Sequence, residues 1–439
     1  MARLFQPGGN KTKSRTQRKT VTIHALSHKG EGIASDGEHT HFVAGALPGE
    51  QATVELGGKG GNIVLKQITQ PSPQRVAPVC PVYQQCGGCQ LQHLSHDGQL
   101  HYKQDNLIRN LQQQGIDLAA TTILPAMASQ PFSYRRAARL AIYHNPKHQI
   151  TRLGFRARQD KQIVEVDHCP VLVESLNSLL PPLQQLLPML TGVRHIGHIE
   201  LLQLPGASPV VMLREVTPLT AEDLALLQQF ASQHNCQIWR DNGHQRTALT
   251  ASQSYQHAGY DLPLDPGHFF QANDAINAQL VARIADWLGG AKDNQTIEWF
   301  AGNGNFSIPL ALAGLKVHAV ELNGAMTNAL AASAKALDLP QLTSETADLE
   351  EPLNWRYWQR LAPTAALLDP PRAGAKRLCE EINKLPSVQR VVYVSCNPGT
   401  LARDAAQLQA QGLALAELQL VDMYPQSYHS ECIGLFVRG

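Results

Sequence analysis

Three reactive side chains stand at the ends of predicted strands in the C-terminal part of the sequence. Cys396 follows the apolar run VVYVS, Asp369 follows AALL, and Glu431 precedes the apolar run CIGLFV. A thiol between a strand and the start of a helix is a candidate nucleophile, because the helix dipole favours its thiolate form. A carboxylate near it could act as a general base. The alternative is that Cys396 is an ordinary small buried side chain.

Four further cysteines form a second candidate site. Cys80, Cys86 and Cys89 have the spacing C-x5-C-x2-C, and Cys169 lies far downstream in EVDHCPV. Four thiolates can bind an iron–sulfur cluster or a structural zinc ion. The residues alone leave both open, together with a chance cluster of reduced thiols.

A ligand crevice is predicted where the apolar run TIEWF leads into AGNGNFS. Gly302 and Gly304 permit a tight turn and a close approach of the backbone to a ligand. The next predicted strand, KVHAVEL, carries Glu321 near its end, where a carboxylate can bind ribose hydroxyls. The motif G-x-x-x-x-G-K-[ST] does not occur, so a phosphate-binding P-loop is not predicted.

The elements that must position these residues fall into three regions. Short apolar strands alternate with helical stretches from about residue 269 onward, which predicts an α/β domain with a doubly wound parallel sheet. Residues 133–260 mix strands and helices and predict an α+β domain. Short strands separated by glycines between residues 21 and 75 predict a small β-barrel. The ligands of a doubly wound sheet bind beyond the carboxyl ends of its strands.

The charge of the chain is locally uneven, although its net charge is only +1. Residues 1–20 carry six Lys or Arg and no acid, and residues 133–161 carry eight Lys or Arg and one acid. Two such stretches favour local contact with a polyanion over a uniformly basic surface. The alternative is a solvated tail and a charged sheet face.

The sequence excludes two classes of protein. It has no apolar run long enough to span a membrane and no secretory signal at its start. We therefore expect a cytoplasmic protein, in which the eight cysteines do not form structural disulfides.

Five segments together resemble the motif set of the RNA uracil-C5 methyltransferase family. In chain order they are HFFQAN, FAGNGNFSIPLA, DPPRAGA, VSCNPGTLARD and DMYPQSYHSE. The resemblance implies a Rossmann-like catalytic domain that uses S-adenosylmethionine (SAM) to methylate carbon 5 of a uracil in RNA. It implies that Cys396 adds to C6 of the base and that Glu431 removes the C5 proton. The SAM site that it implies consists of Gln271, Phe300, Asn305, Glu321, Asp348 and Asp369.

The N-terminal half resembles the ribosomal RNA branch of that family. The spacing of Cys80, Cys86, Cys89 and Cys169 is similar to that of its [4Fe–4S] site, and GEGIA, FVAGALPGE and PSPQRVAPVC resemble an RNA-binding TRAM domain, an OB-like barrel. The resemblance implies that the substrate is a flipped-out uridine of 23S ribosomal RNA and that the protein is a monomer. Within the SAM motifs, Glu298, Ala301 and Asp348 depart from the usual family residues.

These readings divide the chain into four parts. Residues 1–18 are predicted to be a disordered basic arm, residues 19–76 a TRAM barrel, residues 77–262 a central α+β domain with the cysteine loop, and residues 263–439 the catalytic domain. The helix near residues 97–120 is expected to pack against the catalytic domain, as the resemblance implies.

Two other functions stay open. One is the same reaction on transfer RNA, against which the four cysteines argue. The other is a catalytically silent RNA-binding or assembly factor, against which the presence of both Cys396 and Glu431 argues. A DNA cytosine methyltransferase would have its nucleophile in a Pro-Cys pair, and this chain has none.

Overall fold

The computed structural model describes residues 17–35, 39–56, 63–158, 160–289 and 295–439. Most of the predicted basic arm, residues 1–16, therefore lies outside the described residues. Within the described ranges, no helix is both long and apolar enough to cross a membrane.

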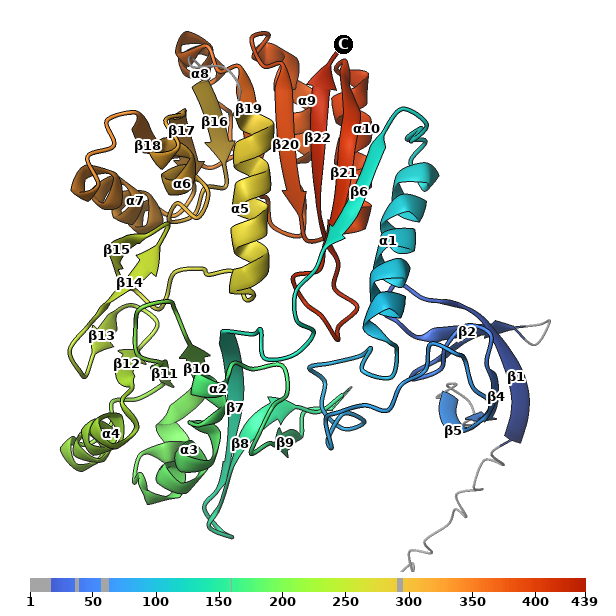
Figure 1. Ribbon diagram of the computed structural model, residues 1–439. Coiled ribbons are helices and arrows are strands. Elements are labelled where there is room, and N and C mark those ends of the chain that lie inside the picture. The colour runs from blue at the N-terminus through green and yellow to red at the C-terminus, as the bar shows by residue number, and fades with distance from the viewer. Residues whose placement is uncertain (1–16, 36–38, 57–62, 159, 290–294) are drawn as a thin grey trace, which may run out of the picture.

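The N-terminal region is a curled five-stranded antiparallel sheet (Figure 1). Its strand order is β3-β2-β1-β4-β5, and the edge strands β3 and β5 also contact each other. Alternate residues such as Val21 and Ile23 are buried inside the curl, whereas Thr22 and His24 are exposed, which is the period of a half-buried strand. The strands are β1 (Gln17–Leu26), β2 (Gly32–Ser35), β3 (Thr40–Val43), β4 (Gln51–Leu56) and β5 (Ile63–Gln70).

The central region is a seven-stranded sheet in the order β13-β12-β11-β10-β7-β8-β9, with helices packed on it. Its strands are β7 (Ala137–Asn145), β8 (Ile150–Arg156), β9 (Ile163–Glu165), β10 (Ile196–Leu202), β11 (Val210–Glu215), β12 (Gln237–Asp241) and β13 (Arg246–Ala248). Its helices are α2 (Glu174–Asn177), α3 (Leu180–Leu186), η1 (Leu187–Met189), η2 (Val193–His195) and α4 (Ala221–His234). The segment 173–190 forms three short helices and not one long helix, because its prolines fit only in the first turn of a helix.

The C-terminal region is an eight-stranded sheet in the order β18-β17-β16-β19-β20-β22-β21-β6. The first five strands are parallel, and β22 lies antiparallel between β20 and β21. The doubly wound parallel sheet predicted from the sequence is thus extended by antiparallel strands. The strands are β16 (Gln295–Trp299), β17 (Lys316–Glu321), β18 (Leu342–Thr346), β19 (Ala365–Leu368), β20 (Arg390–Ser395), β21 (Leu413–Val421) and β22 (Glu431–Arg438). The hairpin β14 (Ser254–His257) and β15 (Tyr260–Pro263) precedes this region.

Helices cover both faces of this sheet, because its strands are apolar on both sides. In β19, Ala365 and Leu367 pack with helices α5, α6 and α7, whereas Ala366 and Leu368 pack with α1, α8, α9 and α10. Such continuous apolar runs are typical of strands buried on both faces. The helices are α5 (Asp274–Leu288), α6 (Ser307–Leu312), α7 (Gly324–Ala336), α8 (Trp355–Leu361), α9 (Lys376–Glu381), η3 (Ile382–Lys384) and α10 (Pro398–Ala410).

An early segment of the chain is built into this sheet. Helix α1 (His96–Gln113) packs against α10, and β6 (Thr122–Met127) pairs in parallel with β21 at the sheet edge (Figure 1). The sequence predicted the helix but not the strand. The segment that follows the cysteine loop therefore lies beside the last strands of the chain.

A small apolar cluster joins the N-terminal sheet to this arrangement. It consists of Leu26, Leu47, Leu91, Leu94 and Tyr102, with Tyr428 packed against it. We call it the barrel–helix cluster. It brings together the N-terminal sheet, helix α1 and the loop that precedes β22.

Candidate active site

Strand pairing places Cys396 beside Glu431. Ser395 at the end of β20 pairs with Cys432 of β22, so Cys396 and Glu431 occupy the next antiparallel position. Asp369 follows β19, the parallel neighbour of β20 on its other side. An antiparallel strand begins at the edge where its parallel neighbours end, and the three predicted residues therefore lie together at one edge of the sheet.

Glu431 is a buried carboxyl group whose pKa lies close to neutral pH. Burial, together with the charge of Asp369, raises its pKa to about 8, whereas the charge of Lys103 acts to lower it. Among the described residues its Oε2 atom has no hydrogen-bond partner. Burial also raises the pKa of Asp369, to about 7. Two carboxyl groups in one desolvated pocket can hold and release protons near neutral pH.

The expectation that Cys396 is readily ionised is wrong for this arrangement. Burial raises the pKa of its thiol, and the charges of Glu431 and Asp369 raise it further. Helix α10 does begin directly after the thiol, with Asn397 as its N-cap, but burial is the largest effect on the thiol and raises its pKa. The charge of Arg372, an exposed residue of the DPPRAG segment, and a backbone hydrogen bond at Cys396 itself act in the opposite direction. The place of Arg372 three residues after Asp369 is a local signal that could have pointed to this role.

The DPPRAG segment is fastened to helix α10 through a buried carboxylate. Asp404 is fully buried, and its Oδ2 atom accepts hydrogen bonds from the Ala375 N–H at 2.7 Å and the Tyr393 hydroxyl at 2.6 Å. Gly374 in the same segment has φ of +80°, where a side chain would be strained. The loop that carries Asp369 and Arg372 is therefore held rigidly.

The predicted ligand crevice lies at the ends of β16 and β17. Phe300, Gly302 and Gly304 all have positive φ, at 65°, 58° and 98°, so the backbone turns sharply after β16. Glu321 holds this turn, because its Oε2 atom accepts a hydrogen bond of 2.9 Å from the Gly302 N–H. Its Oε1 atom accepts a bond of 2.9 Å from the Asn323 N–H. The carboxylate thus shapes the loop and stays at the sheet edge where a ribose would bind.

The other residues predicted for this crevice have different surroundings. Gln271 is buried, and its Oε1 atom has no partner among the described residues. Asn305 exchanges two hydrogen bonds of 2.9 Å with Asn277 of α5. Asp348 is exposed and accepts a hydrogen bond from the Glu350 N–H. His257 of the β14–β15 hairpin also lies against the backbone of the glycine turn, a contact that no local sequence pattern predicts.

The four predicted cysteine ligands line one cavity of about 190 Å³ between the cysteine loop and the central sheet. Burial, together with the charges of the three neighbouring thiols, raises the pKa of Cys89 to about 12. As they stand in this structure, no three His, Cys, Asp or Glu side chains of the described residues form a group that could hold a metal ion. The other thiols are Cys236, Cys379 and Cys432, which are buried elsewhere.

Part of the basic stretch 133–161 is used inside the protein. Arg136 is buried and forms an ion pair with Asp274 at the start of α5. Arg139 pairs with Glu200 on the neighbouring strand. The guanidinium of Arg158 donates a hydrogen bond of 2.7 Å to the carbonyl of Cys89. These residues join regions of the fold, which the count of charges could not reveal.

Comparison with protein families decides the class of this site. The family model described as tRNA (Uracil-5-)-methyltransferase matches residues 95–438. The chain belongs to the uracil-C5 methyltransferase family. The matched region includes the sites of Cys396, Glu431 and the glycine turn, but not the N-terminal sheet or the first three cysteines.

Members of the uracil-C5 methyltransferase family also resemble the chain over its full length. A protein of Vibrio parahaemolyticus named 23S rRNA (uracil(1939)-C(5))-methyltransferase RlmD is 36% identical, with 100% of both chains covered. Proteins of the same name are 37% identical in Vibrio cholerae, with 100% of both chains covered, and 36% identical in Pectobacterium atrosepticum, with 100% of this chain and 98% of that one covered.

A solved structure of this family shares the fold. The tRNA (uracil-54, C5)-methyltransferase of Pyrococcus abyssi, in complex with S-adenosyl-L-homocysteine, matches with a TM-score of 0.72 at 22% identity. The match covers 96% of this chain and 100% of the other. The C-terminal region therefore has the fold of a SAM-dependent methyltransferase, and the curled N-terminal sheet belongs to the shared architecture.

Proposed function

We propose that this protein transfers a methyl group from SAM to carbon 5 of a uridine in 23S ribosomal RNA. The observation that supports the chemistry best is that Cys396 and Glu431 both lie directly beyond the last pair of β20 and β22, Ser395 with Cys432. A nucleophile and a base are then available at the ends of adjacent strands, at the ligand edge of the sheet. The relatives that are 36–37% identical over the full chain carry the name of this reaction, which supports the ribosomal substrate and its uridine 1939.

The proposed reaction uses covalent addition because C5 of uracil is a weak nucleophile. The Cys396 sulfur forms a bond to C6, and the electron pair of the C5–C6 double bond moves toward O4 as an enolate. SAM supplies an electrophilic methyl group, which C5 then takes up. Glu431 removes the C5 proton, the C5–C6 double bond re-forms, and the C6–S bond breaks to return the thiolate. Because the pKa of Cys396 is raised, its proton must leave to a base before attack.

We assign SAM binding to the crevice at the ends of β16 to β19. The unpartnered Oε1 atom of buried Gln271 and the sharp glycine turn provide polar contact and room for a ligand. The residues that we propose to line the site are Gln271, Phe300, Asn305, Glu321, Asp348 and Asp369. The exposed position of Asp348 fits a contact at the rim of the site.

We propose that Cys80, Cys86, Cys89 and Cys169 hold a [4Fe–4S] cluster. Their thiols line a common cavity. Burial, together with the charges of the other three thiols, raises the pKa of Cys89 and so disfavours its thiolate form. Bound metal cations would remove this penalty, because they stabilise thiolates. The ligands of a cluster bind separate iron atoms and therefore surround a volume, whereas those of zinc converge on one point. A cavity of about 190 Å³ lined by all four thiols fits such a volume. These thiols shape the protein and take no part in the methylation steps.

We propose that the N-terminal sheet is a TRAM barrel that binds the RNA, since an antiparallel barrel of this size can support a nucleic-acid surface. The target uridine must leave its stack, because C5 and C6 are otherwise covered by neighbouring bases. A monomer satisfies this proposal, because all the assigned residues come from one chain.

The test is methyl transfer to defined RNAs. Anaerobically purified protein is incubated with methyl-labelled SAM and either unmodified 23S fragments or unmodified transfer RNA, and the product base is mapped. Cys396→Ala should lose transfer while still binding SAM, and Glu431→Gln should accumulate a covalent protein–RNA adduct. Cys236→Ala, a buried thiol outside the site, is the matched control.

The outcomes separate the readings of the site. 5-Methyluridine in one 23S fragment supports the proposal, whereas label only in transfer RNA would keep the chemistry and replace the substrate. Transfer by the Cys396→Ala variant would contradict the covalent mechanism. Absence of transfer by intact wild-type protein on both RNAs would support a silent RNA-binding factor.

A further inference from the structure

The proposed base, Glu431, stands at the end of a long connection. Strands β21 and β22 are antiparallel neighbours, which a turn of two residues can join. Residues 422–430 join them instead, and we call this segment the base loop. Glu431, the first residue of β22, pairs with Val421, the last residue before the base loop. The side chain of Glu431 therefore lies at a strand end whose geometry depends on how the base loop is held.

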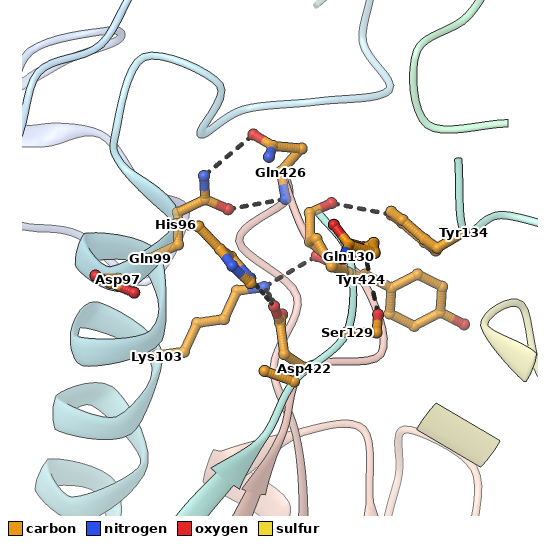
Figure 2. A network of polar contacts seen from close by, with 12 residues as sticks. His96, Asp97, Gln99, Lys103, Ser129, Gln130, Tyr134, Asp422, Tyr424 and Gln426 are labelled. Carbon is orange, nitrogen blue, oxygen red and sulfur yellow. Dashed lines mark hydrogen bonds and ion pairs between the residues drawn. The ribbon is translucent and has the colours of Figure 1, made fainter. Parts of the chain in front are cut away.

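The first anchor is a buried ion pair with helix α1. The Nζ atom of Lys103 donates to Asp422 Oδ1 at 2.6 Å and to the Tyr424 carbonyl at 2.9 Å. The side chains of Lys103 and Asp422 both have 0% exposure. His96 Nε2 lies 3.0 Å from Asp422 Oδ2. Figure 2 shows Lys103 and His96 reaching from α1 to the same carboxylate.

The second anchor fixes the middle of the base loop. Gln99 Oε1 accepts a hydrogen bond of 2.8 Å from the Gln426 N–H, and Gln99 Nε2 lies 3.1 Å from Gln426 Oε1 (Figure 2). The Gln426 carbonyl accepts bonds of 2.9 Å from the N–H groups of Gln90 and Leu91. The Tyr134 hydroxyl donates to the Pro425 carbonyl at 2.9 Å. Every anchor belongs to a segment more than 280 residues away in the sequence.

The ion pair is a costly way to stabilise a fold. Two buried charges lose the free energy of their hydration, and their mutual attraction offsets only part of that loss. Apolar side chains of the same size often stabilise a fold as well or better. What a buried pair provides is a defined geometry. Among the described residues, Lys103 is also the cation whose charge acts on Glu431, against the effects of burial and of Asp369.

We propose that Lys103 and Asp422 are positioning residues for Glu431, which set the base loop so that the carboxylate can remove the C5 proton. This rests on the proposed function. Cys396 is carried by β20 and α10 and does not depend on the base loop. Loss of the pair should therefore leave attack on C6 and methyl transfer in place. It should slow the removal of the C5 proton by Glu431. In this step the C5–H electron pair re-forms the C5–C6 double bond, and the C6–S bond breaks.

The experiment removes both charges at once, because Lys103→Met alone leaves a buried carboxylate unpaired. The variant Lys103→Met/Asp422→Asn is compared with Arg240→Met/Glu215→Gln, which removes a similar pair in the central sheet (Nε to Oε1, 2.8 Å). Both proteins are mixed with SAM and a 23S fragment in a single turnover. The amount of denaturant-stable protein–RNA adduct and the amount of 5-methyluridine are followed with time.

The expected result is that Lys103→Met/Asp422→Asn forms adduct at the wild-type rate but resolves it about tenfold or more slowly, the scale of a misplaced general base. The Arg240→Met/Glu215→Gln control should resolve it as the wild type does. Equal losses of adduct formation and resolution, or wild-type behaviour, would overturn the proposal. A wild-type protein that forms neither adduct nor 5-methyluridine would instead contradict the proposed function.

Discussion

At the scale of the residue, Glu431 is subject to two opposing demands. As the proposed base it must be ionised, yet its surroundings favour the neutral form and raise its pKa from 4.5 to about 8. A carboxylate raised toward neutral pH is a stronger base for a carbon-bound proton than an exposed one. The burial of Glu431 lowers the stability of the folded protein, as is common where a group is placed for function.

This conflict predicts a pH-dependent gain in stability for Glu431→Gln. The folded protein keeps a proton that the unfolded chain loses between pH 4.5 and about 8, so wild-type stability falls as pH rises through that window. The glutamine variant lacks this loss. Its free energy of unfolding, relative to that of the wild type, should therefore increase from pH 5 to pH 8 by at most about 1.4 kcal/mol for each pKa unit. Urea unfolding at several pH values measures it, with exposed Glu351→Gln as control. An advantage that does not change with pH would contradict the assignment.

At the scale of the element, the loops after the strands are fixed by side chains of their neighbours. Asp404 of α10 holds the loop that follows β19 and thereby joins the helix after Cys396 to the segment with Asp369 and Arg372. The order of the strands explains why these two loops are held together. β19 and β20 are parallel neighbours, so the loops that follow them lie at the same edge of the sheet.

Asp404→Ala should therefore lower both stability and methyl transfer. The Tyr393 hydroxyl would lose its acceptor in a buried place, which costs about 1–3 kcal/mol for a group left without a partner, and the Ala375 N–H would keep only its 3.1 Å bond to that hydroxyl. Tyr393→Phe leaves the stronger bond from the Ala375 N–H to Asp404 in place and should cost about 1 kcal/mol. Denaturant unfolding together with single-turnover rates measures both. An Asp404→Ala protein that keeps full activity would show that the loop holds its position unaided.

The sequence was sufficient for the elements whose signals are local. The apolar runs TIEWF, AALL and VVYVS were predicted as strands, and the structure confirms them within a residue. β6 could not be predicted in the same way, since its pairing with β21 joins residues nearly 300 positions apart. The ionisation of Cys396 was misjudged for a similar reason, because the burial of the thiol and the charges of Glu431 and Asp369 arise from parts of the chain that are remote in sequence. Lys103 was missed entirely, because a lysine on a helix is normally a surface residue.

At the scale of the whole molecule, the cysteine loop is part of the support for the active site. Gln90 and Leu91, just after Cys89, donate to the base loop, and Arg158 joins the central sheet to Cys89. Loss of the proposed cluster should loosen this support as well as the cavity around the thiols.

Cys169→Ser should remove the cluster and reduce stability without changing the catalytic residues. Anaerobically purified wild type should contain about four iron and four sulfide per chain, and the variant should contain much less. Cys236→Ser, at a buried thiol away from the cavity, should keep the wild-type content. Metal and sulfide analysis decides the matter, and zinc without sulfide in the wild type would replace the cluster with a structural zinc site.

The barrel–helix cluster has a thermodynamic consequence for substrate selection. Leu26 and Leu47 of the N-terminal region share one apolar contact with Tyr428, three residues before Glu431. Under the proposed binding of RNA to the N-terminal sheet, a displacement of that region by RNA would alter the free energy of the base loop. Linkage would make the effect reciprocal: a base loop settled around the correct uridine would strengthen RNA binding at the N-terminal sheet by the same factor. Discrimination between RNAs would thus be shared between two surfaces, neither of which needs to recognise the whole substrate.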